Sequence, residues 1–358
     1  MAAPSLLICG KIREPEPFAE EAGRYLQWLR DGRINRLVFC GWISDLDDHR
    51  PLISEIAAGG AEVRLIFEPQ IRSVGNFLHQ SKTLHYGLAA FEDEETVIKG
   101  RTDKMPRDWS IDLPVQRLQA RRPAGADSPF RERVCIRGAM MLQPFFFNDM
   151  AFAGRAGDLK RLAHHDLWFD RDHCLLNAEQ MFHSAPFMAT SPVSQVFFRA
   201  NPGLVHESAD LSRALYDRLL NSRLFVGALA ESLIALEQSY QLGFLGEDFA
   251  SPSPVDDFEH VWSTENPDAG VEYSHAAHML TFRSDALPAW LLDLPFHRLG
   301  GGRLRDLAIG MDSAVLEQDR LDLVAMLHQA FPDLPNIPPL PWADGNIKVF
   351  WPRFSYLG

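Results

Sequence analysis

The sequence contains few cysteines and lacks a long apolar segment. Its four cysteines are spread over 358 residues without a C-x-x-C pair, which argues against a zinc ribbon or a disulfide scaffold and favours a reducing environment. A membrane-spanning helix needs about 20 consecutive apolar residues, and no such run occurs. The first residues also lack the basic start of a signal peptide. We therefore expect at most peripheral contact with a membrane.

Positive charge is also scarce. Lysine and arginine total 35 against 48 acidic residues, which gives a net charge of -13. A general nucleic-acid binder needs a basic surface that displaces counterions, so we expect no nucleic-acid partner. Residues 99–137 are the exception, with ten basic and five acidic residues. Guanidinium groups match phosphate oxygens, so this segment is either a place for a phosphate group or a solvated loop.

The glycine signatures of common nucleotide-binding folds are missing. The sequence has no G-x-G-x-x-G after its first apolar run and no G-x-x-x-x-G-K-[ST]. These absences disfavour a Rossmann dehydrogenase and a P-loop kinase. The G-x-S-x-G and H-E-x-x-H motifs are absent too.

The first hundred residues alternate between short apolar runs and stretches with helical spacing. Strands are expected at residues 5–9, 36–40, 62–67 and 96–99, with helices between them. Connections of this length join parallel strands through crossover helices, so the pattern predicts an α/β fold with a mostly parallel sheet. Ligands of such sheets lie beyond the carboxyl ends of the strands. The residues that follow the strands, Gly10, Lys11, Glu68 and Asp103, are therefore candidate site residues.

The rest of the chain carries fewer signals. Strand-like residues end in three phenylalanines followed by Asn148 and Asp149. Burying an acid there is costly without a partner, so Asp149 either lines a cleft or caps a turn. Residues 204–245 have helical spacing with a leucine stripe, which predicts a helical C-terminal extension.

Three segments together resemble a known family. They are NFLHQSKTLHYGLAA at residues 76–90, VIKGRTDK at 97–104 and FFNDMAFAG at 146–154. They are similar to the WavE-type lipopolysaccharide-synthesis proteins, which are glycosyltransferase-like proteins of bacterial surface polysaccharides. In that family a helix with an Asn and a Gln leads into a strand that ends Lys-x-Arg-x-Asp. The segment NAEQMF at 177–182 resembles a later family segment with an acid, and the resemblance spans residues 5–185.

The resemblance implies a GT-A-like fold, in which a mostly parallel sheet flanked by helices binds a nucleotide-sugar. Residues 1–190 would form the nucleotide-sugar-binding domain, and residues 191–358 a mainly helical region on the acceptor side. The implied activity is transfer of a sugar to a glycan or glycolipid acceptor, such as lipopolysaccharide or capsule. The implied location is cytoplasmic, with at most peripheral contact at the inner membrane. The expected donor-binding residues are Gly10, Lys11, Glu68, Asn76, Gln80, Lys99, Arg101 and Asp103.

The resemblance also raises a question about a metal. GT-A enzymes usually carry D-x-D after the fourth strand, where the last carboxylate holds Mn²⁺ or Mg²⁺ on the diphosphate. Here the motif is Arg101-Thr102-Asp103. Either Asp103 holds a divalent cation, or Arg101 neutralises a phosphate directly.

An inverting transfer also needs a general base for the acceptor hydroxyl. The two candidates are Asp149 and Glu179. We favour Asp149, because three phenylalanines precede it and we expect them to place it near the interior of the sheet. A carboxylate that is partly removed from water is a better base near neutral pH.

Two other functions stay open. A sugar-binding protein without catalysis would retain the fold but lack the acid at position 101. A metal-dependent hydrolase would use the histidines and aspartates of residues 164–173. Adjacent histidines point to different faces of an element, so a polar loop is the favoured interpretation of that cluster.

Overall fold

The computed structural model describes residues 3–69, 77–103, 105, 109–140, 144–163, 178–200, 218–245, 271–274, 279–282, 285–308 and 313–330. It divides into two compact units. The first contains Met1–Arg137, Asn148–Arg171 and Gln238–Glu247, and the second contains Gly138–Phe147, Asp172–Glu237 and Asp248–Gly358. The chain thus crosses between the units several times, whereas the sequence alone indicates one boundary near residue 190.

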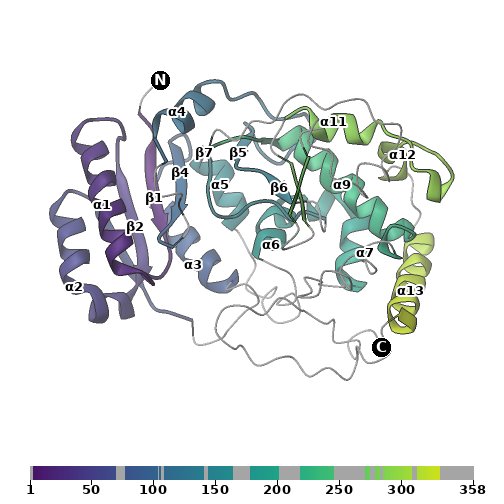
Figure 1. The fold of residues 1–358 in the computed structure, drawn as a ribbon, viewed down its shortest axis with the longest axis horizontal. Helices are drawn as coiled ribbons and strands as arrows, with labels where there is room; N and C mark the ends of the chain where they lie inside the picture. The colour runs from purple at the N-terminus through teal and green to yellow at the C-terminus, as the bar shows by residue number, and fades with distance from the viewer. Residues whose placement is uncertain are drawn as a thin grey trace. The chain divides into compact units, whose positions relative to one another are not determined.

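The first unit is built on a seven-stranded sheet in the order β3-β2-β1-β4-β7-β5-β8 (Figure 1). The strands are β1 (Ser5–Cys9), β2 (Leu37–Trp42), β3 (Glu62–Ile66), β4 (Thr96–Arg101), β5 (Val134–Ile136), β7 (Phe152–Arg155) and β8 (Tyr240–Gln241). Strand β7 runs antiparallel to both of its neighbours, and the remaining strands pair in parallel. The expected α/β fold with a mostly parallel sheet is confirmed.

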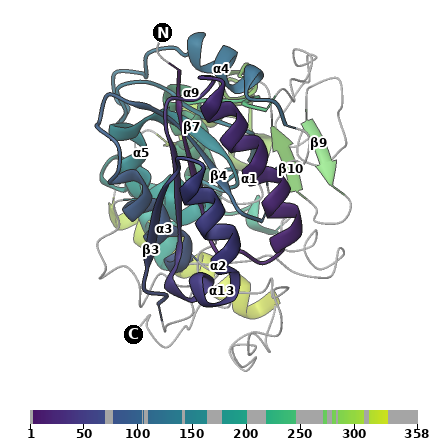
Figure 2. The ribbon, with the colours of Figure 1, turned by 90° about the vertical axis from the view of Figure 1, so that its left-hand side faces the viewer.

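Helices cover both faces of this sheet (Figure 2). Helices α1 (Pro15–Arg30) and α2 (Ile43–Ala58) share a core with Leu6 and Ile8 of β1. On the opposite face, Gly87 of α3 (Phe77–Leu88) lies directly against Leu7 of β1. Helix α5 (Ala156–Ala163) packs beside α3, and α4 (Asp112–Gln119) follows β4 in the chain. Alternate residues of β1 therefore face the two helical layers, as the geometry of a strand requires.

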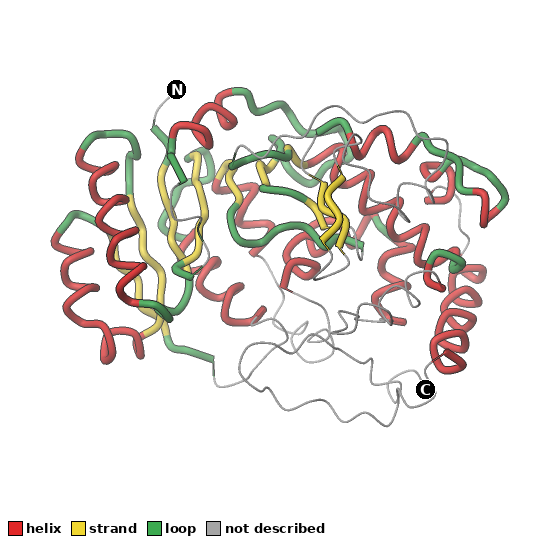
Figure 3. Tube along the Cα trace, in the orientation of Figure 1, coloured by secondary structure: helices red, strands yellow, loops and turns green. Residues whose placement is uncertain are grey.

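The first four expected strands and their helices are confirmed, and Figure 3 shows the alternation. The later part of the unit differs from the sequence prediction. The helical pattern expected to run to residue 245 ends at Ser239, where α9 (Arg223–Ser239) gives way to β8. Tyr240 is fully buried beside β5. Short apolar runs do not distinguish a buried strand from a buried helix, which explains the error.

The order of the strands locates the ligand-binding edge. From β1 the chain first builds outward through β2 and β3, and then returns to place β4 on the other side of β1. Such a reversal leaves a crevice outside the carboxyl ends of the two strands at which it occurs. The crevice is expected where β1 and β4 end, at Cys9 and Arg101.

The second unit is described separately. Its helical elements are α6 (Ala178–Ser184), η3 (Ala185–Thr190), α7 (Pro192–Ala200), most of α9, α11 (Leu287–Leu292), η5 (His297–Leu299), α12 (Leu304–Ala308) and α13 (Ser313–Ala330). A small antiparallel sheet has the order β6 (Ala139–Met140), β10 (Met279–Phe282) and β9 (Val271–Ser274). The buried Glu231 accepts hydrogen bonds from the backbone N–H groups of Val193 and Ser194 at the start of α7. Among the described residues, no helix has the length and apolar character needed to span a membrane.

Candidate active site at the carboxyl ends of β1 and β4

Backbone contacts fix the loop after β1 to the end of β4. The Thr102 N–H donates to the carbonyl of Cys9 at 3.2 Å, and the Thr102 hydroxyl donates to the carbonyl of Lys11 at 2.7 Å. Gly10 between them has φ of 120°, and a Cβ there would lie 3.1 Å from Thr102 Oγ1. Only glycine adopts this conformation readily. The sequence analysis identified Gly10 as a candidate site residue, whereas it did not identify Thr102.

Asp45 holds the same loop from the β2 side. Its carboxylate accepts hydrogen bonds from the N–H groups of Ile12, at 3.3 Å, and Trp42, at 2.9 Å. The side chain is completely buried, and this burial raises its pKa, although both backbone hydrogen bonds oppose the shift. The residues that follow β1 and β2 are thus held together at one edge.

Arg101 is the centre of a cluster that contains four of the expected site residues. Its Nε and Nη2 donate to the two carboxylate oxygens of Asp103, at 2.9 and 3.0 Å. Its Nη1 donates to Oε1 of Gln80 at 3.2 Å and to Oδ2 of Asp149 at 3.4 Å. The pairing with Asp103 is the two-pronged geometry that makes arginine–carboxylate contacts strong. Strand β4, helix α3 and the segment before β7 therefore meet at one guanidinium.

Lys99 lies beneath this cluster. Its Nζ donates to the backbone carbonyls of Asp149, at 2.5 Å, and Met150, at 3.4 Å. The residue is 3% exposed, and burial lowers its pKa to about 8, although the Asp149 charge opposes the shift. We expected a donor-binding side chain here. The observed hydrogen bonds instead show that Lys99 fixes the backbone at Asp149 and Met150.

Glu68 forms a second cluster at the ends of β1, β2 and β3. Its Oε2 accepts hydrogen bonds from Ser44 Oγ at 3.0 Å and Lys11 Nζ at 3.4 Å, and its Oε1 lies 3.7 Å from His79 Nε2. Burial lowers the pKa of His79, although Glu68 opposes the shift. Glu68 and Lys11 are therefore together at this edge, as the strand-end argument predicted.

Solvent reaches Lys11 and Arg13 at this edge more than it reaches Arg101. The side chain of Arg101 is 15% exposed, whereas that of Lys11 is 41% exposed and that of Arg13 is 52% exposed. Arg13 Nη1 lies 3.9 Å from Asp103 Oδ2. The sequence prediction missed Arg13, although its position three residues after Gly10, in a loop at the ligand edge, was a usable signal.

Three arginines of the arginine-rich segment are engaged with other groups of the first unit. Arg121 pairs with Glu132, Arg131 pairs with Glu94, and Arg133 donates to the carbonyl of Tyr240. These contacts give no support to a phosphate site at those three arginines, and the two alternatives for residues 99–137 stay predictions. Lys99 and Arg101 are the basic residues of this segment that belong to the cluster around Asp149.

The surroundings of Asp103 do not suit a divalent cation. Both carboxylate oxygens accept hydrogen bonds from Arg101, and Arg13 brings a second guanidinium nearby. A cation at Asp103 would therefore face two positive groups. In the described ranges of the chain, no group of three or more His, Cys, Asp and Glu side chains is placed to hold a metal ion. The residues around Asp103 therefore do not fit the Mn²⁺ or Mg²⁺ that the resemblance led us to consider there.

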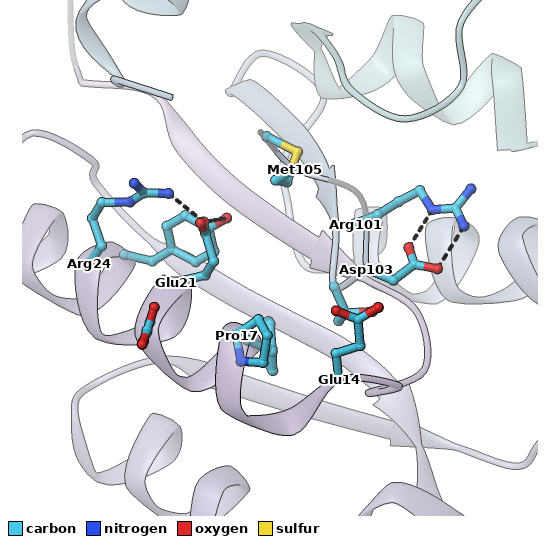
Figure 4. Close-up of a pocket in the computed structure, with 11 residues that line it drawn as sticks. Glu14, Pro17, Glu21, Arg24, Arg101, Asp103 and Met105 are labelled. Carbon is cyan, nitrogen blue, oxygen red and sulfur yellow. Dashed lines mark hydrogen bonds and ion pairs between the residues drawn. The ribbon is translucent and has the colours of Figure 1, made fainter. Parts of the chain in front are cut away.

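A pocket of about 310 Å³ adjoins Arg101 and Asp103 on the side of α1 (Figure 4). Thr102 and Met105 complete the wall formed by the segment after β4. The rest of the lining comes from α1, as far along as Tyr25, and from the residue before this helix. It consists of Glu14, Pro17, Phe18, Glu20, Glu21, Arg24 and Tyr25.

Other expected site residues cannot be placed at this edge. Asn76 and the cluster of histidines and aspartates at residues 164–173 lie outside the described residues. Glu179 lies in the first turn of α6, an element of the second unit, and its side chain is likewise outside the description. The metal-dependent hydrolase therefore has no described site.

Comparisons with known proteins identify no relative. No family model matches the sequence, and neither a curated protein nor a solved structure is significantly similar to it.

Proposed function

We propose that the protein is a glycosyltransferase that binds a nucleotide-sugar donor at the carboxyl ends of β1 and β4 and transfers its sugar to a glycan or glycolipid acceptor. The single observation that supports this most is the cluster around Arg101. Gln80, Asp103 and Asp149, which the resemblance selects from three separate segments, all contact this one guanidinium. We further propose that the sheet is of the GT-A type.

The proposal assigns the diphosphate of the donor to the cationic groups of this edge. Lys11 and Arg13 are half-exposed and follow Gly10 in the loop after β1. Arg101, at the end of β4, is less exposed. Guanidinium and ammonium groups stabilise the charge that develops on a leaving nucleoside diphosphate. The start of α1 is unsuited to binding a phosphate, because Pro15 and Pro17 lack N–H groups and Glu14 and Glu16 add negative charge.

Asp149 is the proposed general base. Its Oδ2 accepts a hydrogen bond from Arg101, so the other oxygen, Oδ1, is the one assigned to accept the proton of the acceptor hydroxyl. The hydrogen bond from Lys99 to the Asp149 carbonyl fixes the backbone at this point. A positioned carboxylate is what general-base catalysis requires. Glu179 is the second candidate.

One observation favours an alternative, which is binding of a nucleotide-sugar without transfer. Arg101 occupies the position at which GT-A enzymes usually carry the first acid of D-x-D, and it engages both oxygens of Asp103. A protein of this kind would bind the donor and release no product.

The experiment is an assay of the purified protein against a panel of nucleotide-sugars, with release of nucleoside diphosphate followed by mass spectrometry. We expect turnover of at least one donor in the presence of a surface-glycan acceptor. Asp103→Asn should lower turnover strongly, because Arg101 loses the carboxylate that orients it. It should also lower the melting temperature, because Arg101 is largely buried and loses its closest charged partner. Asp93→Asn, which changes an exposed acid paired with Lys160, is the matched control. Binding of a donor without any turnover would favour the alternative, and full activity of Asp103→Asn would contradict the assigned site.

A further inference from the structure

The pocket beside Arg101 and Asp103 has a chemistry that the proposed diphosphate site does not explain. Its described lining contains four carboxylates, from Glu14, Glu20, Glu21 and Asp103, and two guanidinium groups, from Arg24 and Arg101. The lining is therefore net negative. A phosphate group is repelled by such surroundings, so the pocket is suited to a different part of a ligand.

Two of these carboxylates are already neutralised by the two arginines. Arg24 Nη2 donates to Glu21 Oε2 at 2.5 Å, and Arg101 holds Asp103. Figure 4 shows these two pairs on opposite sides of the pocket. The negative charge that remains belongs to the other two acids of the lining.

Those two acids are Glu14 and Glu20. Both are exposed, and Glu14 makes no capping hydrogen bond with α1 even though it directly precedes the helix. In the described part of the chain, no ion pair neutralises either carboxylate. The pocket thus presents two carboxylates that a ligand can use.

Part of the pocket lining is apolar. This part comes from Phe18 and Tyr25, which are buried, and from Pro17 and Met105. The Tyr25 hydroxyl is already engaged with Glu21 at 2.8 Å. At about 310 Å³, the pocket is at the lower end of the range for small-molecule sites, which is about 300–1,000 Å³. A small ring with one apolar face and polar substituents fits this combination.

We propose that this pocket binds an amino sugar through its protonated amine. The amine would contact Glu14 or Glu20, the hydroxyl groups would donate to the remaining carboxylates, and the apolar face of the ring would lie against the apolar side chains of the lining. That this sugar is a unit of the substrate rests on the proposed function. The preference for a cationic sugar rests on the pocket alone.

The test is a titration of the full-length protein, followed by ligand-observed NMR, with D-glucosamine, D-glucose and N-acetyl-D-glucosamine. At about pH 6.5 the amine of glucosamine is protonated, and the other two sugars are neutral. We expect glucosamine to bind about tenfold more tightly than either neutral sugar, and added salt to weaken this binding. Equal binding of the three sugars, or binding of none, would overturn the proposal.

Substitutions of the lining acids test whether glucosamine binds in this pocket. The double variant Glu14→Gln/Glu20→Gln should weaken glucosamine binding about tenfold and leave glucose unaffected. Glu16→Gln is the matched control, because Glu16 is an exposed acid in the first turn of α1 that does not line the pocket. If the control weakens binding as much as the double variant, the preference reflects overall charge and the proposal fails.

A competition experiment shows whether the bound sugar belongs to the donor or to the acceptor. UDP-glucosamine should displace glucosamine if the pocket holds the sugar of the donor, whereas it should bind alongside glucosamine if the pocket holds an acceptor unit. Either result supports the pocket. If glucosamine binds as expected and no nucleotide-sugar is turned over, the proposed transferase function fails and the amino-sugar pocket stands. If turnover occurs without any preference for the amine, the pocket proposal fails alone.

Discussion

Arg101 Nη1 lies 3.4 Å from Asp149 Oδ2, although 48 residues separate them in the chain. The two side chains are largely buried, with exposed fractions of 15% and 4%. Removing one partner from such a pair leaves a buried charge without compensation, which costs far more than an exposed ion pair gains. The contact therefore fixes the segment before β7 against the end of β4, where the proposed chemistry takes place.

The role of Asp149 can be tested with one isosteric change. If Asp149 is the general base, Asp149→Asn should lower the turnover rate at saturating donor by about 10²–10⁴-fold, because the amide cannot accept the proton. Donor affinity should change much less, and Glu179→Gln should be milder. The measurement is steady-state transfer beside the melting temperature. A variant that loses stability but keeps its turnover would show that Asp149 only anchors Arg101.

The buried Lys99 predicts a dependence of stability on pH. Burial lowers its pKa from 10.5 to about 8 in the folded protein. Between these values the unfolded chain holds a proton that the folded chain has lost, so stability rises with pH across this window. Relative to Lys99→Met, the wild type should gain up to about 3 kcal/mol between pH 8 and 10.5. Urea unfolding of both proteins at several pH values measures this difference, and a constant difference would contradict the assignment.

A substitution of Gly10 tests whether the conformation of the loop after β1 contributes to stability. Its φ is 120°, and a Cβ at this position would lie 3.1 Å from Thr102 Oγ1, which leaves no comfortable place for a side chain. We expect Gly10→Ala to lower the free energy of unfolding by about 1–3 kcal/mol. Gly23→Ala is the control, because Gly23 lies in α1 with open space around it, and alanine there should stabilise the helix by up to about 1 kcal/mol. Similar effects of the two substitutions would show that the conformation of Gly10 is unimportant.

The sequence predicted the first half of the sheet well, because each strand from β1 to β4 contains a short apolar run and stretches with helical spacing separate these runs. The second run was expected to end before Gly41, whereas β2 continues through this glycine to Trp42. The rule that ligands collect at strand ends then selected Gly10, Lys11, Glu68 and Asp103 correctly as residues of one edge. Strand β7 escaped prediction because its four residues, Phe152–Arg155, are too few to show a period. Strand β8 escaped because the apolar pattern of α9 continues through it.

The sequence indicated which residues lie at the site better than it indicated which contacts they make. Nothing local indicates that Arg101 would engage both Asp103 and Asp149, since the second contact depends on the fold bringing β7 beside β4. The same tertiary arrangement buries Lys99, a residue type that sequence reasoning places at the surface. Charge density does not indicate Arg13, because this residue lies outside the arginine-rich segment 99–137. Its position shortly after the end of β1 is the informative feature.

The most direct test of the central claim is calorimetric titration of the protein with nucleoside diphosphates in the presence of EDTA and in the presence of Mn²⁺. The account predicts that one nucleoside diphosphate binds with similar affinity in both conditions, because arginine and lysine side chains supply the positive charge. Arg13→Gln should weaken this binding about tenfold, and Arg30→Gln, at the exposed end of α1, should leave it unchanged. Absence of binding by every nucleoside diphosphate, or binding that Arg13→Gln does not affect, would contradict the account.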